Sequence, residues 1–356
     1  MRRVTALALA TLALAATAGC ATSAERAEPE APPAAATPVE TDPPSRGGPD
    51  EPDPTAAPGS SAPPGSATPE RDGDTKAFGP PTLLGRFDAT EVPGASGLAA
   101  SARNPGWRYL LDDRPGTDAV WLLDGQAQLH GPLRIAGLDA VDTESLEVAP
   151  CGADDARSCL YVGDIGDNLR SREHVEVHRV VEPDLDGPLP TGPLPAETAR
   201  LAYPDRPHDA EALLVDAGGR PFLVTKAPFD AERGETGPTR LYAASGFADG
   251  VLEEVGQLTL PAPQRRVLGP VVGDVVTGGS VAGDGRVLLR TYDHVVLLTP
   301  PEPGAGLATL PTWAAEEVPG PLLPQAEAVA WDADGCGYAL VSERVGDLWH
   351  VRCVTG

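Results

Sequence analysis

Apolar and polar positions alternate in short runs along most of the chain after residue 80. Runs such as "WRYLLDD" and "HVVLLTP" are bounded by Gly, Asp, Asn and Pro. Short apolar runs between such turn-forming residues are typical of β-strands. The pattern therefore predicts an all-β domain.

This strand pattern repeats five times along the chain. Second and third strands follow the first strand of every repeat, and fourth strands are recognisable in the first four repeats. The fifth repeat stops at Gly356 without a fourth strand, while the strand-like "TLLGRFDA" from Thr82 precedes the first repeat. The first strands are "SGLAAS" from Ser96, "ESLEVAP" from Glu144, "EALLVDA" from Glu211, "GGSVAGDG" from Gly278 and "EAVAWDA" from Glu327.

A β-propeller of five four-stranded blades explains both the extra strand before the first repeat and the missing fourth strand of the last repeat. The N-terminal strand from Thr82 would complete the last blade and leave no unpaired sheet edge, which sheet proteins avoid. Because the repeats are unevenly spaced, six blades are the alternative.

The N-terminus predicts export. Arg2 and Arg3 precede an apolar run that is too short to span a membrane, and residues 1–20 therefore form a signal peptide. The stretch "TAGC" resembles the lipobox of bacterial lipoproteins, which implies lipidation of Cys20 and an extracytoplasmic place on the cell membrane. Thr17 departs from the usual Leu of that motif, so secretion of a free protein is the alternative.

Composition divides the remaining chain into two parts. Residues 21–80 are rich in Pro, Ala and Glu, cannot bury a core, and are expected to form a disordered linker. Residues 81–356 form the propeller, which we expect to be a monomer. The formal net charge of −25 argues against nucleic acid and anionic lipid as partners and suits cationic ligands or metal ions.

Four further cysteines fit an exported domain. Since an even number in such a protein indicates disulfides and no zinc spacing is present, we expect two bridges. Each pair would span one β-hairpin of the predicted blades, which gives Cys151–Cys159 and Cys336–Cys353.

Blade topology predicts that acidic residues gather on one face of the propeller. First strands line the central channel, so Glu144, Glu211 and Glu327 at their starts should converge at its mouth. The loop between the second and third strands reaches the same face, and in the second repeat it reads "DIGDN". Other residues expected there are Asp142, Asp209, Asp113, Lys226, Arg290 and Arg344.

Three interpretations of this acidic face remain open. The acids pair with Lys226, Arg290 and Arg344 and fix the blade geometry, or they bind Ca²⁺ through oxygen ligands, or they catalyse a reaction. His208 or His294 could act as a general base, whereas no nucleophile elbow, P-loop or dinucleotide fingerprint is present. The tentative metal ligands are Glu144, Glu211, Glu327, Asp164, Asp167 and Asn168.

The sequence also resembles an actinobacterial family of exported β-propeller proteins without a known activity. The resemblance rests on "ESLEVAP", "LYVGDIGDNLR", "DAEALLVD", "VTGGSVAGDGRVLLRTY" and "QAEAVAW" and covers roughly residues 95–345. It implies a propeller outside the cytoplasm. Family members often carry acids where this chain has Gly94 and Gly278, and their first loop differs from Asp112, Asp113 and Arg114 here.

These observations favour a binding module over an enzyme. We expect a surface-tethered propeller whose acidic face engages an extracellular protein or a cationic ligand, with Ca²⁺ as an optional cofactor. The alternatives are a Ca²⁺-dependent hydrolase of the lactonase, esterase or phytase type and a structural scaffold without a small-molecule site. Fold analogy alone does not decide among them.

Overall fold

The computed structural model describes residues 77–230, 235–265, 268 and 274–354. The chain divides into two units, Met1–Glu70 and Arg71–Gly356, and every described residue belongs to the second. The predicted signal peptide, Cys20 and nearly all of the predicted linker therefore lie outside the described residues. Within the described ranges, no helix is long and apolar enough to cross a membrane.

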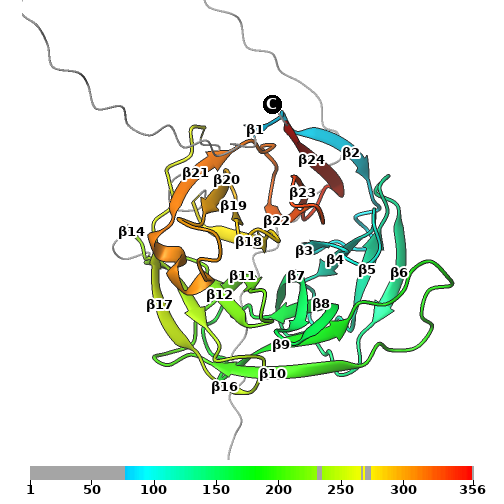
Figure 1. Ribbon diagram of the computed structural model, residues 1–356, viewed down its shortest axis with the longest axis horizontal. Coiled ribbons are helices and arrows are strands. Elements are labelled where there is room, and N and C mark those ends of the chain that lie inside the picture. The colour runs from blue at the N-terminus through cyan, green and yellow to red at the C-terminus, as the bar shows by residue number, and fades with distance from the viewer. Residues whose placement is uncertain (1–76, 231–234, 266–267, 269–273, 355–356) are drawn as a thin grey trace, which may run out of the picture. The chain divides into compact units, whose positions relative to one another are not determined.

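Five antiparallel sheets surround a central channel and form a five-bladed propeller (Figure 1). Blade 1 contains β3 (Ala95–Ala100), β4 (Arg108–Asp112), β5 (Ala119–Leu123) and β6 (Leu129–Arg134). Blade 2 contains β7 (Thr143–Gly152), β8 (Asp155–Asp164), β9 (Val175–Val181) and β10 (Ala196–Ala202). Blade 3 contains β11 (Ala210–Val215), β12 (Pro221–Thr225), β15 (Thr239–Ala243) and β17 (Glu253–Leu258).

The last two blades complete the ring. Blade 4 contains β18 (Val276–Val281), β19 (Val287–Thr291), β20 (Val295–Thr299) and β21 (Ala314–Val318). Blade 5 contains β22 (Ala326–Trp331), β23 (Gly337–Ser342), β24 (Asp347–Val354) and β2 (Thr82–Arg86). Small additions are β1 (Ala77–Phe78) on β24, β16 (Gly250–Val251) on β10, the hairpin of β13 (Phe229–Asp230) and β14 (Glu235–Thr236), and the 3₁₀ helix η1 (Leu307–Thr312).

The N-terminal strand closes the last blade, as the sequence predicts. β2 pairs antiparallel with β24, with Leu83 opposite Trp349, so the fourth strand of blade 5 comes from the start of the domain. In Figure 1 the cyan β2 lies beside the dark red β24. The prediction of five blades is confirmed, and the alternative of six is wrong.

Apolar packing between neighbouring blades holds the ring together. Middle strands are buried on both faces; in β12, for example, Leu223 packs toward blade 2 while Phe222 and Val224 pack toward blade 4. Five separate apolar clusters result, one between each pair of adjacent blades. One of them joins Leu98 of blade 1 to Val341 of blade 5 and so closes the ring.

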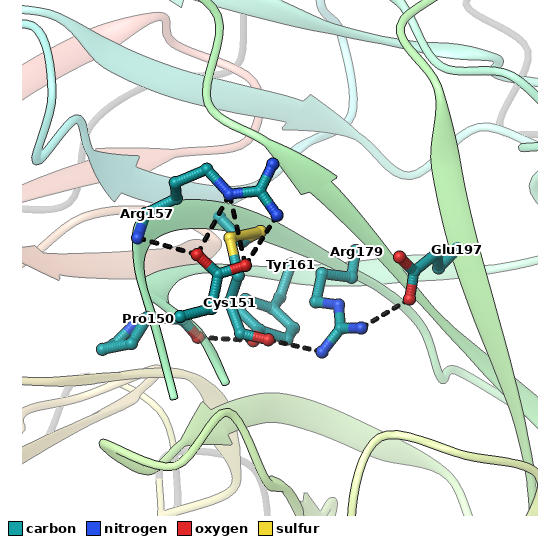
Figure 2. The surroundings of a disulfide bond; sticks show 8 residues. Pro150, Cys151, Arg157, Tyr161, Arg179 and Glu197 are labelled. Carbon is teal, nitrogen blue, oxygen red and sulfur yellow. Dashed lines mark hydrogen bonds and ion pairs between the residues drawn. A yellow bond between two sulfur atoms is a disulfide. The ribbon is translucent and has the colours of Figure 1, made fainter. Parts of the chain in front are cut away.

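Both disulfides that the hairpins predict are present. Cys151 of β7 is bonded to Cys159 of β8, and Cys336 is bonded to Cys353 of β24. Figure 2 shows the first bridge, where Arg179 donates to the Cys151 carbonyl and pairs with Glu197. These contacts tie the end of the long β7–β8 hairpin to the outer strands of blade 2.

Small residues let the inner strands approach one another in the middle of the channel. Ser96, Gly97, Gly278 and Gly279 lie at this level, and the space between them holds no water-sized volume. A Cβ atom on Gly278 would lie 2.5 Å from the Glu327 carbonyl oxygen. The channel is therefore closed in its middle, and its two ends are separate surfaces.

Candidate functional site

Three glutamates stand at equivalent positions at one end of the channel, which we call the mouth. In β7, β11 and β22 the pairing register shifts by one residue at Glu144, Glu211 and Glu327, so each is the extra residue of a β-bulge. Bulges re-aim side chains and are frequent beside functional sites. All three side chains are at most 7% exposed.

The remaining two blades carry small hydroxyl residues at this level. The bulge of β18 falls at Thr277, whose hydroxyl donates to the Ala326 carbonyl oxygen over 2.7 Å. In β3 the register shifts across Ser96, whose hydroxyl donates to carbonyl oxygens of Thr143 and Glu144. Thr277, rather than Gly278, therefore corresponds to the glutamates in blade 4.

The "DIGDN" loop supports the mouth through hydrogen bonds of its two aspartates. Asp164 accepts hydrogen bonds from the amides of Val141 and Asp142 and from the guanidinium of Arg172. Asp167 accepts from the amides of Ser171 and Arg172 at 2.9 and 2.8 Å. Both carboxylates thus already accept hydrogen bonds from the protein itself, three at Asp164 and two at Asp167.

The glycine of this loop makes room for two carboxyl groups. A Cβ atom on Gly166 would lie 2.6 Å from Asp142 Cγ and 2.8 Å from Glu144 Oε1. Asn168 is exposed and donates to Asp142 Oδ2 over 3.2 Å. The loop therefore presses its backbone against the Asp142 and Glu144 carboxyls and orients them.

Asp142 and Glu144 form a hydrogen-bonded carboxyl pair. Burial, followed by the charges of Glu211 and Asp142, raises the pKa of Glu144 well above its ordinary value. Burial and the charge of Asp209 also raise the pKa of Asp142, while the hydrogen bond from Glu144 lowers it. Of the two carboxyls, Glu144 therefore has the higher affinity for a proton.

Lys226 is the internal cation of the mouth. Its ammonium donates to Glu211 Oε1 over 2.5 Å, and its side chain is 25% exposed. Burial raises the pKa of Glu211 to about 8 although Lys226 opposes the shift. Burial lowers the pKa of Lys226, but Glu211 and the other neighbours outweigh it and the net shift is upward, which keeps the ammonium charged.

A second group of acids lies on the side of blades 1 and 5. Burial raises the pKa of Asp113 to about 7, and the charges of Glu343 and Asp112 add to this shift. Burial also raises the pKa of Glu327 to about 7, whereas Lys226 and a hydrogen bond from Tyr292 lower it. A Cβ atom on Gly94 would lie 1.9 Å from Asp113 Oδ1. Asp113 therefore fills the space that a side chain at position 94 would need.

Among the described residues, two of the three predicted counter-ions form no ion pair with the three glutamates, although the charge of Glu327 acts on the pKa of Arg290. Arg290 is fully buried in blade 4, donates to the Pro321 carbonyl oxygen, and leaves Nε and Nη1 without a hydrogen-bond partner. Arg344 has a side chain that is 73% exposed and lies 3.7 Å from Glu343. Spacing along the strands places these residues near the mouth but does not give the direction of their side chains.

The two histidines considered as bases have structural partners. His208 Nε2 lies 3.0 Å from Asp205 Oδ1 and 2.9 Å from the Tyr242 hydroxyl. His294 contacts the Thr291 hydroxyl and the Pro261 carbonyl oxygen. Among the described residues, neither histidine forms a hydrogen bond with a mouth carboxyl.

Sequence reasoning missed Arg172, which holds Asp164 and the Gly166 carbonyl oxygen. Arg172 lies four residues beyond "DIGDN", so a basic residue shortly after the loop was the available signal. Blade topology placed the loops of Tyr292 and Glu343 at the mouth, but only the structure shows that Tyr292 donates to Glu327 and that Gln325 donates to Glu343.

The other end of the channel contains one buried acid. Glu147 of β7 is 3% exposed and accepts from the amide of Val281 in β18, across the channel, over 2.8 Å. It borders a cavity of about 220 Å³ together with Ser280 and Trp331. Burial raises the pKa of Glu147 to about 8 although three hydrogen bonds lower it.

No protein-held metal site is evident in the described part of the chain. Among those residues, no group of three or more His, Cys, Asp or Glu side chains is arranged to bind an ion. The carboxylates of Asp164 and Asp167 also accept hydrogen bonds from the protein. The arrangement of the six tentative ligands therefore does not fit the predicted Ca²⁺ site.

Comparisons with known proteins add distant structural similarities. No protein-family model and no curated protein matches the chain significantly. The structure of a streptogramin B lyase is 8% identical in sequence, with a TM-score of 0.35; the match covers 74% of this chain and 66%, just under two thirds, of the lyase. A gluconolactonase from Xanthomonas campestris is 14% identical, with a TM-score of 0.38 and coverage of 70% of this chain and 69% of the gluconolactonase. A glucose dehydrogenase is also 14% identical, with a TM-score of 0.42 and coverage of 76% of this chain and 99% of the dehydrogenase. Similarities this distant assign no activity to this protein.

Proposed function

We propose that the protein is a surface-tethered, extracytoplasmic binding module that takes up a cationic group at the mouth. One observation carries this proposal: the carboxyl groups at the mouth outnumber its cations. Among the described residues, Lys226 pairs with Glu211 and Arg344 lies 3.7 Å from Glu343, while Arg172 pairs with Asp164 beside this group. The carboxyls are Asp113, Asp142, Glu144, Asp209, Glu211, Glu327 and Glu343.

Burial favours the protonated forms of several of these carboxyls in the free protein. The pKa values of Asp113 and Glu327 are raised to about 7 and that of Glu211 to about 8, mainly because burial disfavours their charged forms. A bound cation would stabilise the carboxylates and release these protons. Binding should therefore strengthen as the pH rises, by up to about tenfold per pH unit for each proton released.

Calorimetric titration of the full-length protein with spermidine, and separately with Ca²⁺, tests the proposal. We expect spermidine to bind at pH 8 and low ionic strength, to release protons, and to bind about tenfold more weakly at pH 6. A Glu144→Gln/Glu327→Gln variant should lose this binding, whereas Glu253→Gln, on the exposed outer strand β17, should keep it. Absence of binding by both probes at pH 8 would mean that the mouth is neutralised internally, as in a structural scaffold.

Hydrolysis is the second candidate function, because Asp142 and Glu144 form a carboxyl pair with unequal proton affinities. General acid–base catalysis uses such a pair. The contacts of Asp164 and Asp167 disfavour the Ca²⁺-dependent form of this hypothesis. Turnover of lactone and phosphate ester substrates that is lost in both Asp142→Asn and Glu144→Gln would support an enzyme; binding without turnover would support the module.

A further inference from the structure

Four exposed apolar residues lie in the loops that carry mouth residues. Leu169 is 87% exposed, Val141 54%, Val345 40% and Leu322 39%. Each lies within three residues of a mouth residue along the chain, namely Asn168, Asp142, Glu343 and Gln325 respectively. We call these four side chains the apolar rim.

Two members of the rim, Val141 and Leu169, lie in segments fixed by hydrogen bonds to Asp164 and Asp167. The Val141 amide donates to Asp164, and Leu169 sits in the turn that Asp167 closes through the amides of residues 170 to 172. Exposed apolar residues scattered singly need no explanation, but apolar residues gathered on one face mark an interaction surface. Of the five other exposed large apolar residues in the described chain, Leu83 and Val251 lie on outer strands, Val181 and Val354 end third strands, and Leu268 lies outside the strands.

Charge complementarity indicates what covers this surface. The centre is acidic and partly buried, and the rim is apolar, so a hydrated metal ion or a polyamine would leave the rim unused. Anionic lipid and nucleic acid are repelled by the carboxyls. A basic side chain flanked by apolar ones matches both parts of the surface, with the cation at the centre and the apolar neighbours on the rim.

We propose that the mouth receives a Lys or Arg side chain of a protein partner, whose flanking apolar residues pack on Val141, Leu169, Leu322 and Val345. This inference rests on the proposed function, since it names the class of partner for the same surface. Partner recognition of this kind has a polar anchor for specificity and apolar contacts for affinity.

Three peptides with the full-length protein test the inference by fluorescence anisotropy. They are labelled Ser-Leu-Lys-Leu-Ser, Ser-Ser-Lys-Ser-Ser and Ser-Leu-Glu-Leu-Ser, each with blocked ends. We expect the first to bind about tenfold more tightly than the second, a difference of about 1.4 kcal/mol, and the third not to bind. A Val141→Ser/Leu169→Ser variant should lose the preference while its affinity for Ser-Ser-Lys-Ser-Ser stays unchanged. Val251→Ser is the matched control on the exposed outer strand.

The outcomes separate the two proposals. Equal affinity for both lysine peptides overturns the role of the rim and leaves cation binding at the mouth intact. A preference that survives in Val141→Ser/Leu169→Ser also overturns it. Failure of both lysine peptides together with spermidine removes the proposed function and this inference with it, whereas spermidine binding without peptide binding overturns the inference alone.

Discussion

Two glutamates three residues apart on β7 have opposite surroundings. Glu144 at the mouth faces other carboxyls and Lys226, and the pKa of its side chain rises through burial and through neighbouring negative charge. Glu147 at the opposite end is just as buried, but it meets backbone amides and a serine hydroxyl. Burial raises the pKa of both side chains, and the two ends differ in that the mouth gathers several carboxyls whereas the opposite end supplies hydrogen-bond donors to one.

Among the variants that test this difference between the two ends, replacement of Lys226 should cause the largest loss of unfolding free energy. Lys226→Met leaves Glu211 buried without its ion-pair partner, and breaking such a pair costs about 3 kcal/mol or more. Because the abandoned carboxyl takes up a proton at low pH, the loss in unfolding free energy should be larger at pH 8.5 than at pH 6. Urea denaturation at both pH values measures it.

Two further variants serve as the control and the rescue for the Lys226→Met measurement. Arg344→Met, which removes a side chain that is 73% exposed, should change stability by less than about 0.5 kcal/mol. The double variant Lys226→Met/Glu211→Gln should recover much of the loss, since it removes the buried charge as well. Equal losses at both pH values would contradict an ion pair between Lys226 and Glu211.

Crowding the carboxyl pair should have the next largest effect. Gly166→Ala places a Cβ atom inside contact distance of Asp142 and Glu144, and overpacking of this kind costs about 1–3 kcal/mol. Thermal unfolding measures the loss, and spermidine affinity should fall with it. Gly187→Ala, where no atom lies within 4 Å of the added carbon, is the control and should be neutral.

Removing the acid at the opposite end should change the pH dependence of stability. Glu147 has a pKa of about 8 when folded against an ordinary value of 4.5. The folded state therefore keeps one proton that the unfolded state has lost, and the protonated side chain contributes stability that is full below pH 4.5 and is lost as the pH rises to 8. In Glu147→Gln the decline of unfolding free energy across this window should be shallower by about 1.4 kcal/mol per pH unit. An unchanged slope would show that Glu147 is ionised at neutral pH.

The smallest effect concerns the loop that supports the mouth. Asn168→Ala removes an exposed donor to Asp142, so the pKa of Asp142 should rise slightly and stability should change by less than about 0.5 kcal/mol. Carboxyl carbon NMR titration measures the shift. Leu169→Ser, which removes a neighbouring side chain without a hydrogen bond, should leave this pKa unchanged.

Short-range patterns in the sequence determined the architecture. Apolar repeats, turn residues and the unpaired strand at Thr82 were sufficient to predict five blades, the closure of β2 on β24 and both disulfides, because hairpin pairing follows from neighbouring segments. The convergence of Glu144, Glu211 and Glu327 followed from blade topology.

Tertiary structure alone decided what those acids contact. A one-residue bulge places each glutamate outside the regular alternation of its strand, and no spacing in the sequence reveals it. The same holds for the structural roles of Asp164 and Asp167 and for the burial of Arg290, which depend on side-chain directions across loops and blades. The sequence by itself thus determined which strands pair and which end of the propeller is acidic. Packing between distant segments decided which carboxyls the protein satisfies internally, because those contacts join residues far apart in the sequence.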